Sequence, residues 1–355
     1  MIRTLLLCIL CAANLWALDS LKIVMVGDAL LHKSVYEDAR TDEGAYDFTP
    51  MLDLIAPLIK SYDVRFYNQE TILGGTELGL STYPAFNSPQ EFGDSMLKLG
   101  FNLVSLANNH TLDRGEKGVR AMLMYWRDAE SKRSDLLTAG SYESAQDRAT
   151  PRIMTKNGIT YTMLAYTYGT NGIPIPQGKE YLVNVYTKQM LLEDIKAVRP
   201  KVDLLIVSMH WGIEYEHAPS NEQRELARFL AQNGVDIIIG NHPHVIQPIE
   251  IIDNTFVIYS LGNFLSGQKG LAKNIGALIG LSLHKTKEGK IIFDDIQSEL
   301  IYTHSTQGAH FRLYPFSQLT QSLLPNHKQI QKDYEAILFS EFQTYPTKQN
   351  KLSKP

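Results

Sequence analysis

The chain has 355 residues, of which 44% are hydrophobic and 20% are charged, and its formal net charge is −4. This composition is ordinary for a folded globular protein, and the length is sufficient to bury a sizeable core. No block dense in Lys and Arg stands out, which argues against nucleic acid as a partner bound through a broad basic face.

Residues 1–17 predict a secretory signal peptide. Arg3 supplies a positive charge, an apolar stretch runs from Leu5 to Trp16, and Ala17 is a small residue suited to a cleavage point. The stretch is short for a membrane span. An uncleaved N-terminal anchor is the alternative, and only in that case do we expect the membrane to be a partner. Either way we expect an exported protein, periplasmic or associated with the cell envelope.

The two cysteines of the chain, Cys8 and Cys11, both lie in this first segment. Its removal leaves a mature chain without cysteine, which excludes disulfides and thiolate metal ligands. Any metal must therefore be held by oxygen and nitrogen donors.

Strand-like and helix-like segments alternate along much of the chain. Short β-branched or apolar runs predict strands at Leu21–Val26, Val64–Tyr67, Leu103–Leu106, Leu204–Met209, Ile237–Ile239 and Phe256–Ser260. Apolar residues at helical spacing predict helices at Met51–Ile59, Glu91–Leu99, Gly118–Arg127, Lys188–Val198 and Asn221–Gln232. This alternation is typical of α/β layers in which helices cover the sheets.

Three further pairs of segments predict antiparallel hairpins, so we expect mixed sheets. The clearest has its turn at Asn157-Gly158, because Asn-Gly is a strong hairpin signal. The other two turn at Asp253-Asn254 and between residues 283 and 291. We expect one domain over residues 21–310, a helical extension over 311–343 with a helix at Leu323–Phe342, and a disordered tail over 344–355.

Residues that can bind a metal follow nearly every predicted strand. In open α/β sheets, ligands bind at the carboxyl ends of the strands. Six such ends carry suitable side chains: Gly27-Asp28, Asn68-Gln69-Glu70, Asn108-Asn109-His110, His210-Trp211-Gly212, Gly240-Asn241-His242-Pro243-His244 and Leu261-Gly262-Asn263.

Each of these motifs alone also has a structural interpretation. Gly27-Asp28 could be a turn, Asn109 with its neighbours could cap a helix, and His210 could be a hydrogen-bonded core residue. The His242 and His244 pair is more specific, because residues at i and i+2 of an extended segment share one side. Six coinciding motifs favour a single metal site.

The donors indicate the kind of metal. Carboxylate oxygens with neutral imidazoles suit Mn, Zn or Fe, as one or two divalent ions, and a Ca²⁺ site would not need the histidines. Two such ions that share one carboxylate can bind a phosphoryl group for in-line attack by water. A histidine beside them, His110, is well placed to protonate a leaving group.

The same motifs, read in order, resemble the CapA-type (poly-γ-glutamate capsule biosynthesis) proteins of the calcineurin-like metallophosphatase superfamily. The resemblance runs from about Lys22 to Gly267 and includes Ala107-Asn108-Asn109-His110, His242-Pro243-His244-Val245 and Ser260-Leu261-Gly262-Asn263-Phe264. It implies a metallophosphoesterase-like α/β fold, a four-layer α-β-β-α sandwich, with the metal at the strand ends.

The resemblance also implies roles for single residues. Asp28 corresponds to the first aspartate ligand and Glu70 to the bridging carboxylate, and both are thereby catalytic together with His110. Asn109 corresponds to the amide ligand. The ligand set is completed by three histidines: His210, His242 and His244.

Some positions depart from the superfamily pattern. Leu30 replaces the histidine of the usual Asp-x-His motif, with His32 two residues further on, and the bridging acid is Glu rather than Asp. These departures bear on phosphatase activity more than on metal binding. We expect substrate contacts from residues in or beside the motifs: Arg114, Trp211, Glu214 and Asn263.

Three functions follow from these observations. The first is an exported metal-dependent hydrolase acting on a phosphoester or on a cell-envelope polymer. The second is an accessory protein, working with capsule-synthesis partners, that binds, transfers or exports an anionic surface polymer with little hydrolysis. The third is a degenerate fold that keeps the motifs for stability, which we disfavour because buried polar groups without a metal are costly.

Overall fold

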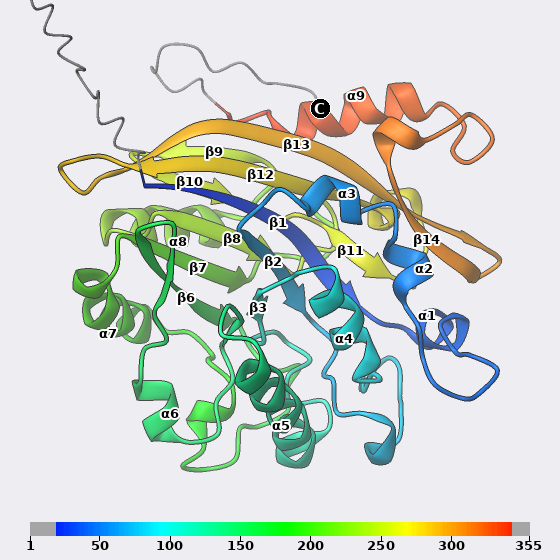
Figure 1. Cartoon of the computed structure of the whole chain (residues 1–355), viewed down its shortest axis with the longest axis horizontal. Helices are drawn as coiled ribbons and strands as arrows, with labels where there is room; N and C mark the ends of the chain where they lie inside the picture. The colour runs from blue at the N-terminus through cyan, green and yellow to red at the C-terminus, as the bar shows by residue number, and fades with distance from the viewer. Residues whose placement is uncertain (1–18, 343–355) are drawn as a thin grey trace, which may run out of the picture.

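Fourteen strands form two mixed sheets in the computed structural model, which describes residues 19–342 (Figure 1). The first sheet contains β1 (Ser20–Leu30), β2 (Val64–Gln69), β3 (Leu103–Ser105), β4 (Leu137–Ala139), β11 (Asn263–Ser266), β12 (Ile275–Lys285), β13 (Ile291–Thr306) and β14 (Ala309–Pro315). The second contains β5 (Met154–Lys156), β6 (Ile159–Thr167), β7 (Leu204–His210), β8 (Ile237–Asn241), β9 (Ile249–Ile252) and β10 (Thr255–Ile258).

Each sheet has a parallel centre and antiparallel edges. In the order β14-β13-β12-β1-β2-β3-β4, strands β1 to β4 are parallel and β12 to β14 are antiparallel, while β11 pairs in parallel with β1. In the order β5-β6-β7-β8-β10-β9, only β5 and β9 run antiparallel to their neighbours. The parallel strands therefore bring several carboxyl ends to the same side of the molecule.

The helices and short 3₁₀ turns lie mostly between strands. The helices are α1 (Lys33–Asp38), α2 (Thr49–Leu52), α3 (Ala56–Ile59), α4 (Glu91–Lys98), α5 (Gly115–Lys132), α6 (Ala145–Ala149), α7 (Lys188–Val198), α8 (Asn221–Gln232) and α9 (His327–Leu338). The 3₁₀ turns are η1 (Thr76–Leu78), η2 (Glu180–Leu182), η3 (Arg199–Lys201), η4 (Leu271–Asn274) and η5 (Phe316–Gln318). Within residues 19–342, no helix combines the length and apolar character needed to cross a membrane.

Alternating residues of β7 show the layering directly. Leu204 and Ile206 belong to the large core between the sheets, whereas Leu205 and Val207 belong to a second core together with residues of α7 and α8. On the first sheet, the ring of Tyr67 packs against Phe92 of α4. Helices thus cover the outer faces of both sheets, which confirms the four-layer α-β-β-α sandwich.

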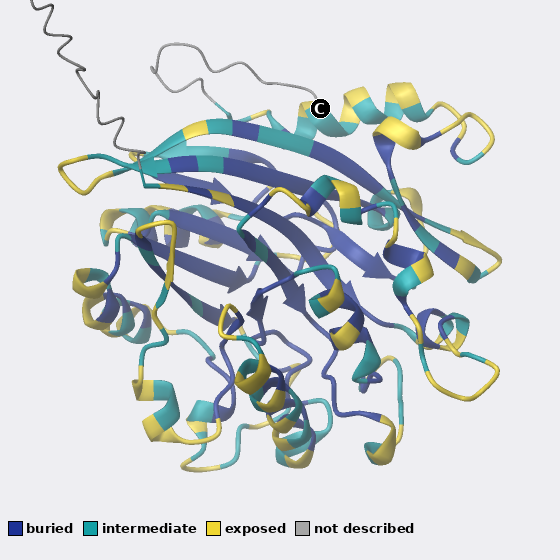
Figure 2. Ribbon diagram, in the orientation of Figure 1, coloured by how far each residue is buried: buried dark blue, intermediate teal, exposed yellow. Residues whose placement is uncertain are grey.

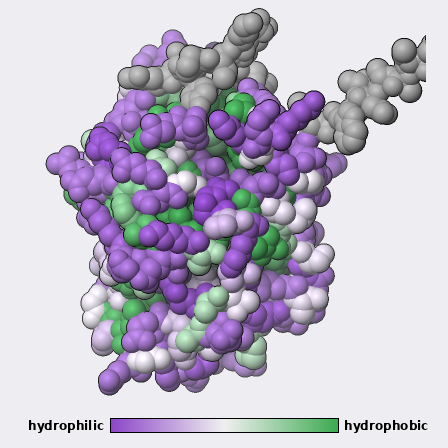
Figure 3. All heavy atoms as spheres, turned by 90° about the vertical axis from the view of Figure 1, so that its left-hand side faces the viewer, coloured by the Kyte–Doolittle hydropathy of each residue, from purple (hydrophilic) through white to green (hydrophobic). Residues whose placement is uncertain are grey.

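Burial follows the same layering (Figure 2). The central strands are buried, and the exposed residues lie on the outer sides of the helices and in the loops. The face on which many strands begin is largely hydrophilic, with smaller hydrophobic areas between (Figure 3).

Most expected elements are present, and the exceptions have local causes. The expected helix at Met51–Ile59 is two short helices, α2 and α3, with Pro57 in the first turn of the second, where its missing N–H is tolerated. The expected helix at Leu323–Phe342 is shorter, because it starts after Asn326, a residue with a left-handed φ of 59°.

The three expected hairpins are confirmed as β5–β6, β9–β10 and β12–β13. Asn157 and Gly158 have φ values of 50° and 80°, as a tight hairpin turn with the right twist requires. Strand β14 runs across residue 310, where we expected the domain to end, so the first part of the 311–343 extension belongs to the first sheet. The expected signal peptide, residues 1–17, and tail, 344–355, lie outside the described residues.

Candidate metal centre

Asp28 lies near the end of β1, where the strand exchanges neighbours. The β1–β2 register shifts before Asp28, and the residue pairs with Asn263 of β11. Gly27 makes this approach possible, because a Cβ there would lie 1.8 Å from the carbonyl oxygen of Gly262. Asn263 therefore begins a strand beside Asp28, whereas we expected it to follow the strand at Phe256–Ser260.

Asp28 is fully buried and is held by polar groups from two other segments. Its Oδ1 accepts a hydrogen bond from Nδ2 of Asn68 (2.8 Å), and its Oδ2 accepts one from the backbone N–H of His242 (3.2 Å). The carboxylate is thereby fixed at the centre of the expected site.

Glu70 follows β2 directly and is also fully buried, but neither of its carboxylate oxygens has a hydrogen-bond partner. Its Oε1 lies 3.6 Å from Nε2 of His210 and 3.6 Å from Nε2 of His244. A buried carboxylate without a donor is costly. This carboxylate is thus available to a cation between the sheets.

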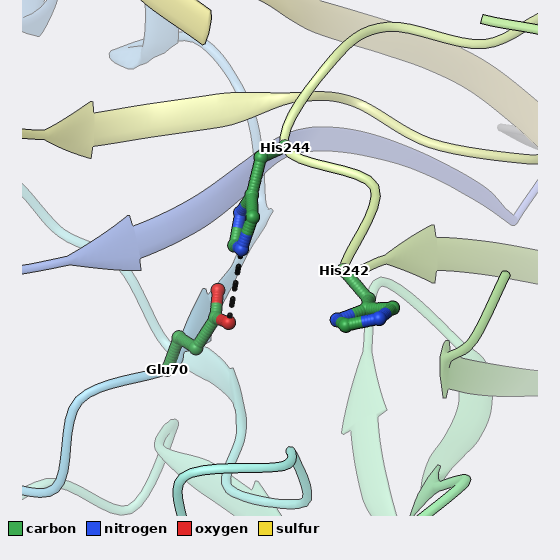
Figure 4. A group of neighbouring side chains, drawn as sticks. All are labelled: Glu70, His242 and His244. Atoms are coloured by element: carbon green, nitrogen blue, oxygen red, sulfur yellow. Dashed lines mark ion pairs between the residues drawn. The ribbon is translucent and has the colours of Figure 1, made fainter. Parts of the chain in front are cut away.

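His242 and His244 lie in the loop after β8, and their backbone conformation differs from the one that the sequence predicted. We expected an extended segment, but the two residues have φ values of 97° and 58°, in the left-handed region. Figure 4 shows the Glu70 carboxylate directed at the His244 ring, with the His242 ring beside them. The Nδ1 atom of His242 is buried and has no hydrogen-bond partner.

Two groups of side chains place candidate ligand atoms within 4.8 Å of one another. One group is Glu70, His242 and His244, and the other is Asp28, Glu70 and His210. All five side chains are buried. Glu70 belongs to both groups, which is the arrangement that a bridging carboxylate needs.

Asn109 lies at the edge of these groups. Its Oδ1 is 2.9 Å from Nε2 of His210, and its Nδ2 donates to Oδ1 of Asn171 (3.3 Å). The amide oxygen is therefore directed at the histidines, where an amide ligand is expected.

His110 is paired with an acid that the sequence interpretation did not include. Its Nδ1 lies 2.7 Å from Oδ2 of Asp113, and this oxygen also accepts the backbone N–H of Phe86 (2.6 Å). The Asp113 side chain is 1% exposed. The spacing of three residues within one turn was the available sequence evidence, but it is a common spacing and carries little information alone.

Without a metal, burial and neighbouring charges shift the pKa values of the buried side chains of the centre. Burial raises the pKa of Glu70 well above its usual value, although His244 opposes this. Burial alone would lower the pKa of His244, but Glu70 and Asp28 outweigh it and raise the pKa to about 9. Burial lowers the pKa of His242 to about 3 and that of His210 well below its usual value.

These residues fit a divalent metal. The donors are carboxylates and imidazoles, the set that suits Mn, Zn or Fe. The unpartnered atoms of Glu70 and His242 are the ones that a cation would satisfy. The residues that could hold one or two ions are the expected set: Asp28, Glu70, Asn109, His210, His242 and His244.

A cleft of 740 Å³ opens onto the centre, and its wall includes Asn109, His110, Asp113, Glu214 and His244. His110, the candidate proton donor, and the metal centre therefore border the same cleft, which a substrate could enter.

The four expected substrate contacts occupy different places. Glu214 is exposed and lines the cleft, whereas Asn263 is buried beneath it with its Oδ1 3.0 Å from Nδ1 of His244. Arg114 and Trp211 are not among the cleft residues. Arg114 donates to Leu78 O, Gly79 O and Ser81 Oγ, and Trp211 is buried, with its Nε1 donating to Tyr259 O.

The structure also shows where the residues that depart from the usual Asp-x-His motif lie. Leu30 and His32 both line the cleft. The Nδ1 of His32 lies 3.1 Å from the backbone oxygen of Leu30, and its ring packs edge-on against Phe86 at 5.2 Å. His32 is not part of either group of candidate ligands.

Sequence comparison places these motifs in a known family. The sequence model of the family described as "Bacterial capsule synthesis protein PGA_cap" matches residues 22–268. The PGA biosynthesis protein CapA of Bacillus subtilis (strain 168) is 31% identical over 199 residues, which cover 54% of this chain and 50% of that protein. The capsule biosynthesis protein CapA of Bacillus anthracis is 28% identical over 284 residues, covering 78% of this chain and 66% of that protein. The chain thus spans about half to two thirds of these relatives.

Solved structures that resemble this chain include a calcineurin-like phosphoesterase and a nucleotidase. The calcineurin-like phosphoesterase YfkN of Bacillus subtilis has a TM-score of 0.44 at 15% identity and covers 89% of this chain and 98% of that chain. The NAD nucleotidase NadN of Haemophilus influenzae has a TM-score of 0.47 at 13% identity, covering 93% and 65%. These similarities are too low to carry an activity over to this chain.

Proposed function

The chain belongs to the bacterial capsule synthesis protein family, PGA_cap, and on that premise we propose that it is an exported metal-dependent hydrolase acting on a phosphoester or polymer of the cell envelope. The observation that carries this proposal is Glu70, a buried carboxylate without hydrogen-bond donors that both groups of candidate metal ligands share. Without a metal neither carboxylate oxygen accepts a hydrogen bond, and the imidazoles of His210 and His244 at 3.6 Å compensate the buried group only in part.

Each residue of the centre has a stated part in this proposal. Asp28, Glu70 and the histidines of the two groups hold the metal, with Asn109 as an additional ligand. A divalent ion held there supplies a Lewis acid that polarises a phosphoryl or carbonyl oxygen of the substrate. The cleft that Asn109 and His244 line admits the substrate and the water molecule that hydrolysis consumes.

His110 donates the proton to the leaving group. The Asp113 carboxylate accepts the N–H at Nδ1 of His110, so the proton that passes to the leaving group is the one that the doubly protonated ring carries on Nε2. The edge of the imidazole ring is also fixed by Phe86, whose ring centroid lies 4.7 Å away. Asp113 is a positioning residue, since it acts through His110.

The family supports a substrate in the cell envelope. The two Bacillus relatives are named for the biosynthesis of PGA and of a capsule. For this chain we propose a substrate in, or attached to, such a polymer, and proteins of capsule synthesis as its partners. Export is the proposal's second part, and it rests on residues 1–17. Cell fractionation with N-terminal sequencing of the mature protein tests it, and a cytoplasmic chain that retains Met1 would contradict it.

A second function, binding or transfer of an anionic polymer with little hydrolysis, is supported by the same relatives, whose names refer to biosynthesis. The two functions differ in turnover, and this difference can be measured.

The test incubates metal-replete protein with chromogenic phosphoesters, γ-linked glutamate oligomers and peptidoglycan-type amides. We expect turnover of at least one class, abolished by chelation and by His110→Gln. Polymer binding by a protein that turns over none of the three classes would overturn the hydrolase and leave the binding function. Equal turnover by the His110→Gln variant would overturn the role of His110.

A further inference from the structure

Lys273 brings a cation into the cleft without a carboxylate partner. It belongs to η4 and is only partly exposed, and the cleft residues include it together with Lys269. Within residues 19–342 it forms no ion pair. A partly buried ammonium group is stabilised by an anion that approaches it. The ammonium group of Lys273 therefore indicates that the cleft binds an anionic group.

Tyr215 holds this cation in place. The Lys273 Nζ lies 4.6 Å from the centroid of the Tyr215 ring, within the range of a cation–π interaction. Tyr215 has a φ of 68°, which is unusual for an aromatic residue. Its backbone N–H donates to the carbonyl oxygen of Pro243 (2.8 Å), and its ring lies 6.2 Å from that of His244. The ring is thus anchored to the loop that carries two candidate ligands.

Asn263 connects the same loop to Lys273 from below. Its Oδ1 lies 3.0 Å from Nδ1 of His244, and its Nδ2 donates to the backbone oxygen of Lys273 (2.9 Å) and to Oε1 of Gln268 (2.9 Å). Gln268 in turn donates to the hydroxyl of Tyr215 (3.4 Å). The metal centre and the lysine are therefore tied together by a network with a buried asparagine at its base.

We propose that Lys273, held against Tyr215, binds a carboxylate or phosphate group of the substrate adjacent to the group that reacts at the metal centre. This inference rests on the proposed function, and it adds the residue that selects an anionic substrate. Lys273 of η4 and His244 line the same cleft, so an anion bound to Lys273 lies in the space that opens onto the metal centre.

Glu214 restricts how such a substrate can lie. Its carboxylate is exposed, lines the same cleft and neighbours Tyr215 in sequence. An anionic group is repelled from Glu214 and attracted to Lys273 and Lys269, so the charged groups of the substrate face η4. The cleft thereby orients an anionic chain as well as attracting it.

The test measures calorimetric binding to the metal-replete full-length protein, not turnover. The probes are a short γ-linked glutamate oligomer, the same oligomer with its carboxylates converted to carboxamides, and a short polyphosphate. We expect Lys273→Gln to weaken binding of at least one anionic probe about 10-fold to 100-fold, the loss typical of removing a hydrogen bond between charged groups at a partly exposed site. The carboxamide probe should bind weakly to both proteins.

Two variants control this test. Lys273→Arg keeps the charge and should retain most of the affinity, while Lys98→Gln on α4 removes an exposed charge outside the cleft residues and should have little effect. Equal loss in Lys98→Gln would mean that only net charge matters and would overturn the proposal.

The outcomes also separate this inference from the proposed function. If an anionic probe binds in a way that depends on Lys273 but no substrate is turned over, the role of Lys273 is supported and the hydrolase function is contradicted. Turnover and anion binding that are both unchanged in Lys273→Gln overturn the inference alone. A wild-type protein that binds neither anionic probe also overturns it. The preferred probe identifies the anion as carboxylate or phosphate.

Discussion

The Oδ1 atom of Asn263 lies 3.0 Å from Nδ1 of His244 and thereby fixes the ring of a candidate metal ligand from behind. Oδ2 of Asp28 lies 3.3 Å from the same nitrogen. Both oxygens favour a proton on Nδ1, which leaves Nε2, 3.6 Å from Oε1 of Glu70, as the atom that can bind a metal. Partners of this kind set the tautomer and orientation of metal-binding histidines.

Asn263→Ala should therefore weaken metal affinity about 10-fold to 100-fold, because the His244 ring loses this partner. Competition with a chromogenic chelator measures the affinity. Asn102→Ala is the matched control, since Asn102 is also buried but hydrogen-bonds Arg65 N and Asp63 O. It should lower the melting temperature and leave metal affinity unchanged. An equal loss of affinity in both variants would mean that general destabilisation is the cause.

Asp113→Asn should lower kcat by about 10²-fold to 10⁴-fold with metal content unchanged, because the amide can donate to Nδ1 of His110, where the carboxylate only accepts, and so favours the other tautomer. Nitrogen NMR of the His110 ring should show the change of tautomer independently of any substrate. Asp94→Asn on α4 is the control, where the carboxylate accepts the Tyr125 hydroxyl instead. An unchanged His110 spectrum in Asp113→Asn would show that Asp113 does not fix the tautomer of His110.

Arg114→Ala should act on stability and not on substrate affinity. The guanidinium donates three hydrogen bonds to the loop at residues 78–81, and their loss should cost about 1–3 kcal/mol in the free energy of unfolding. Arg120→Ala, which removes the ion pair between an exposed guanidinium and Glu116, should cost less than Arg114→Ala. Denaturant unfolding measures both. A stable Arg114→Ala protein with a raised KM would restore the substrate contact expected from the sequence.

Glu299 offers a test of the packing beyond residue 310. This carboxylate on β13 accepts the backbone N–H of Ser317 (2.8 Å), and burial, with Glu335 of α9 adding to it, raises its pKa. A folded-state pKa above the unfolded value means that the folded state binds more protons, so this group's contribution to stability falls as pH rises through that range. The melting temperature of Glu299→Gln relative to wild type should therefore increase between pH 4.5 and 7.5, about the range above the ordinary pKa of Glu.

Glu225→Gln on α8 removes an exposed carboxylate elsewhere on the surface and is the control for the loss of one charge. If the relative melting temperature of Glu299→Gln does not rise with pH, Glu299 is not buried against the segment that follows β14.

The architecture and the clustering of the strand ends could be predicted from the sequence. Alternating apolar runs and the Asn157-Gly158 turn are local signals, and parallel strands bring their carboxyl ends together whatever their side chains. Asp28, Glu70 and the three histidines were found in this way, and the structure brings them into two adjacent groups.

Contacts between distant segments could not be predicted. The backbone of His242 and His244 is left-handed because the loop after β8 turns back toward Asp28, and periodicity contains no information about that turn. Arg114 and Trp211 were expected at the substrate because they lie beside motifs, but nearness in sequence does not determine where a long side chain points. Lys273 lies outside every motif, and its role could be inferred only from the structure, through its contact with Tyr215.

The central claim is that the buried side chains at the strand ends hold a divalent metal, and elemental analysis of the purified protein tests it most directly. Wild type loaded with Mn²⁺ or Zn²⁺ should retain at least about one ion per chain after gel filtration, or about two if Glu70 bridges a pair. Asp28→Ala and the double variant His242→Ala/His244→Ala should lose that metal while remaining folded by circular dichroism. A folded wild-type protein that retains no metal after loading would contradict the account.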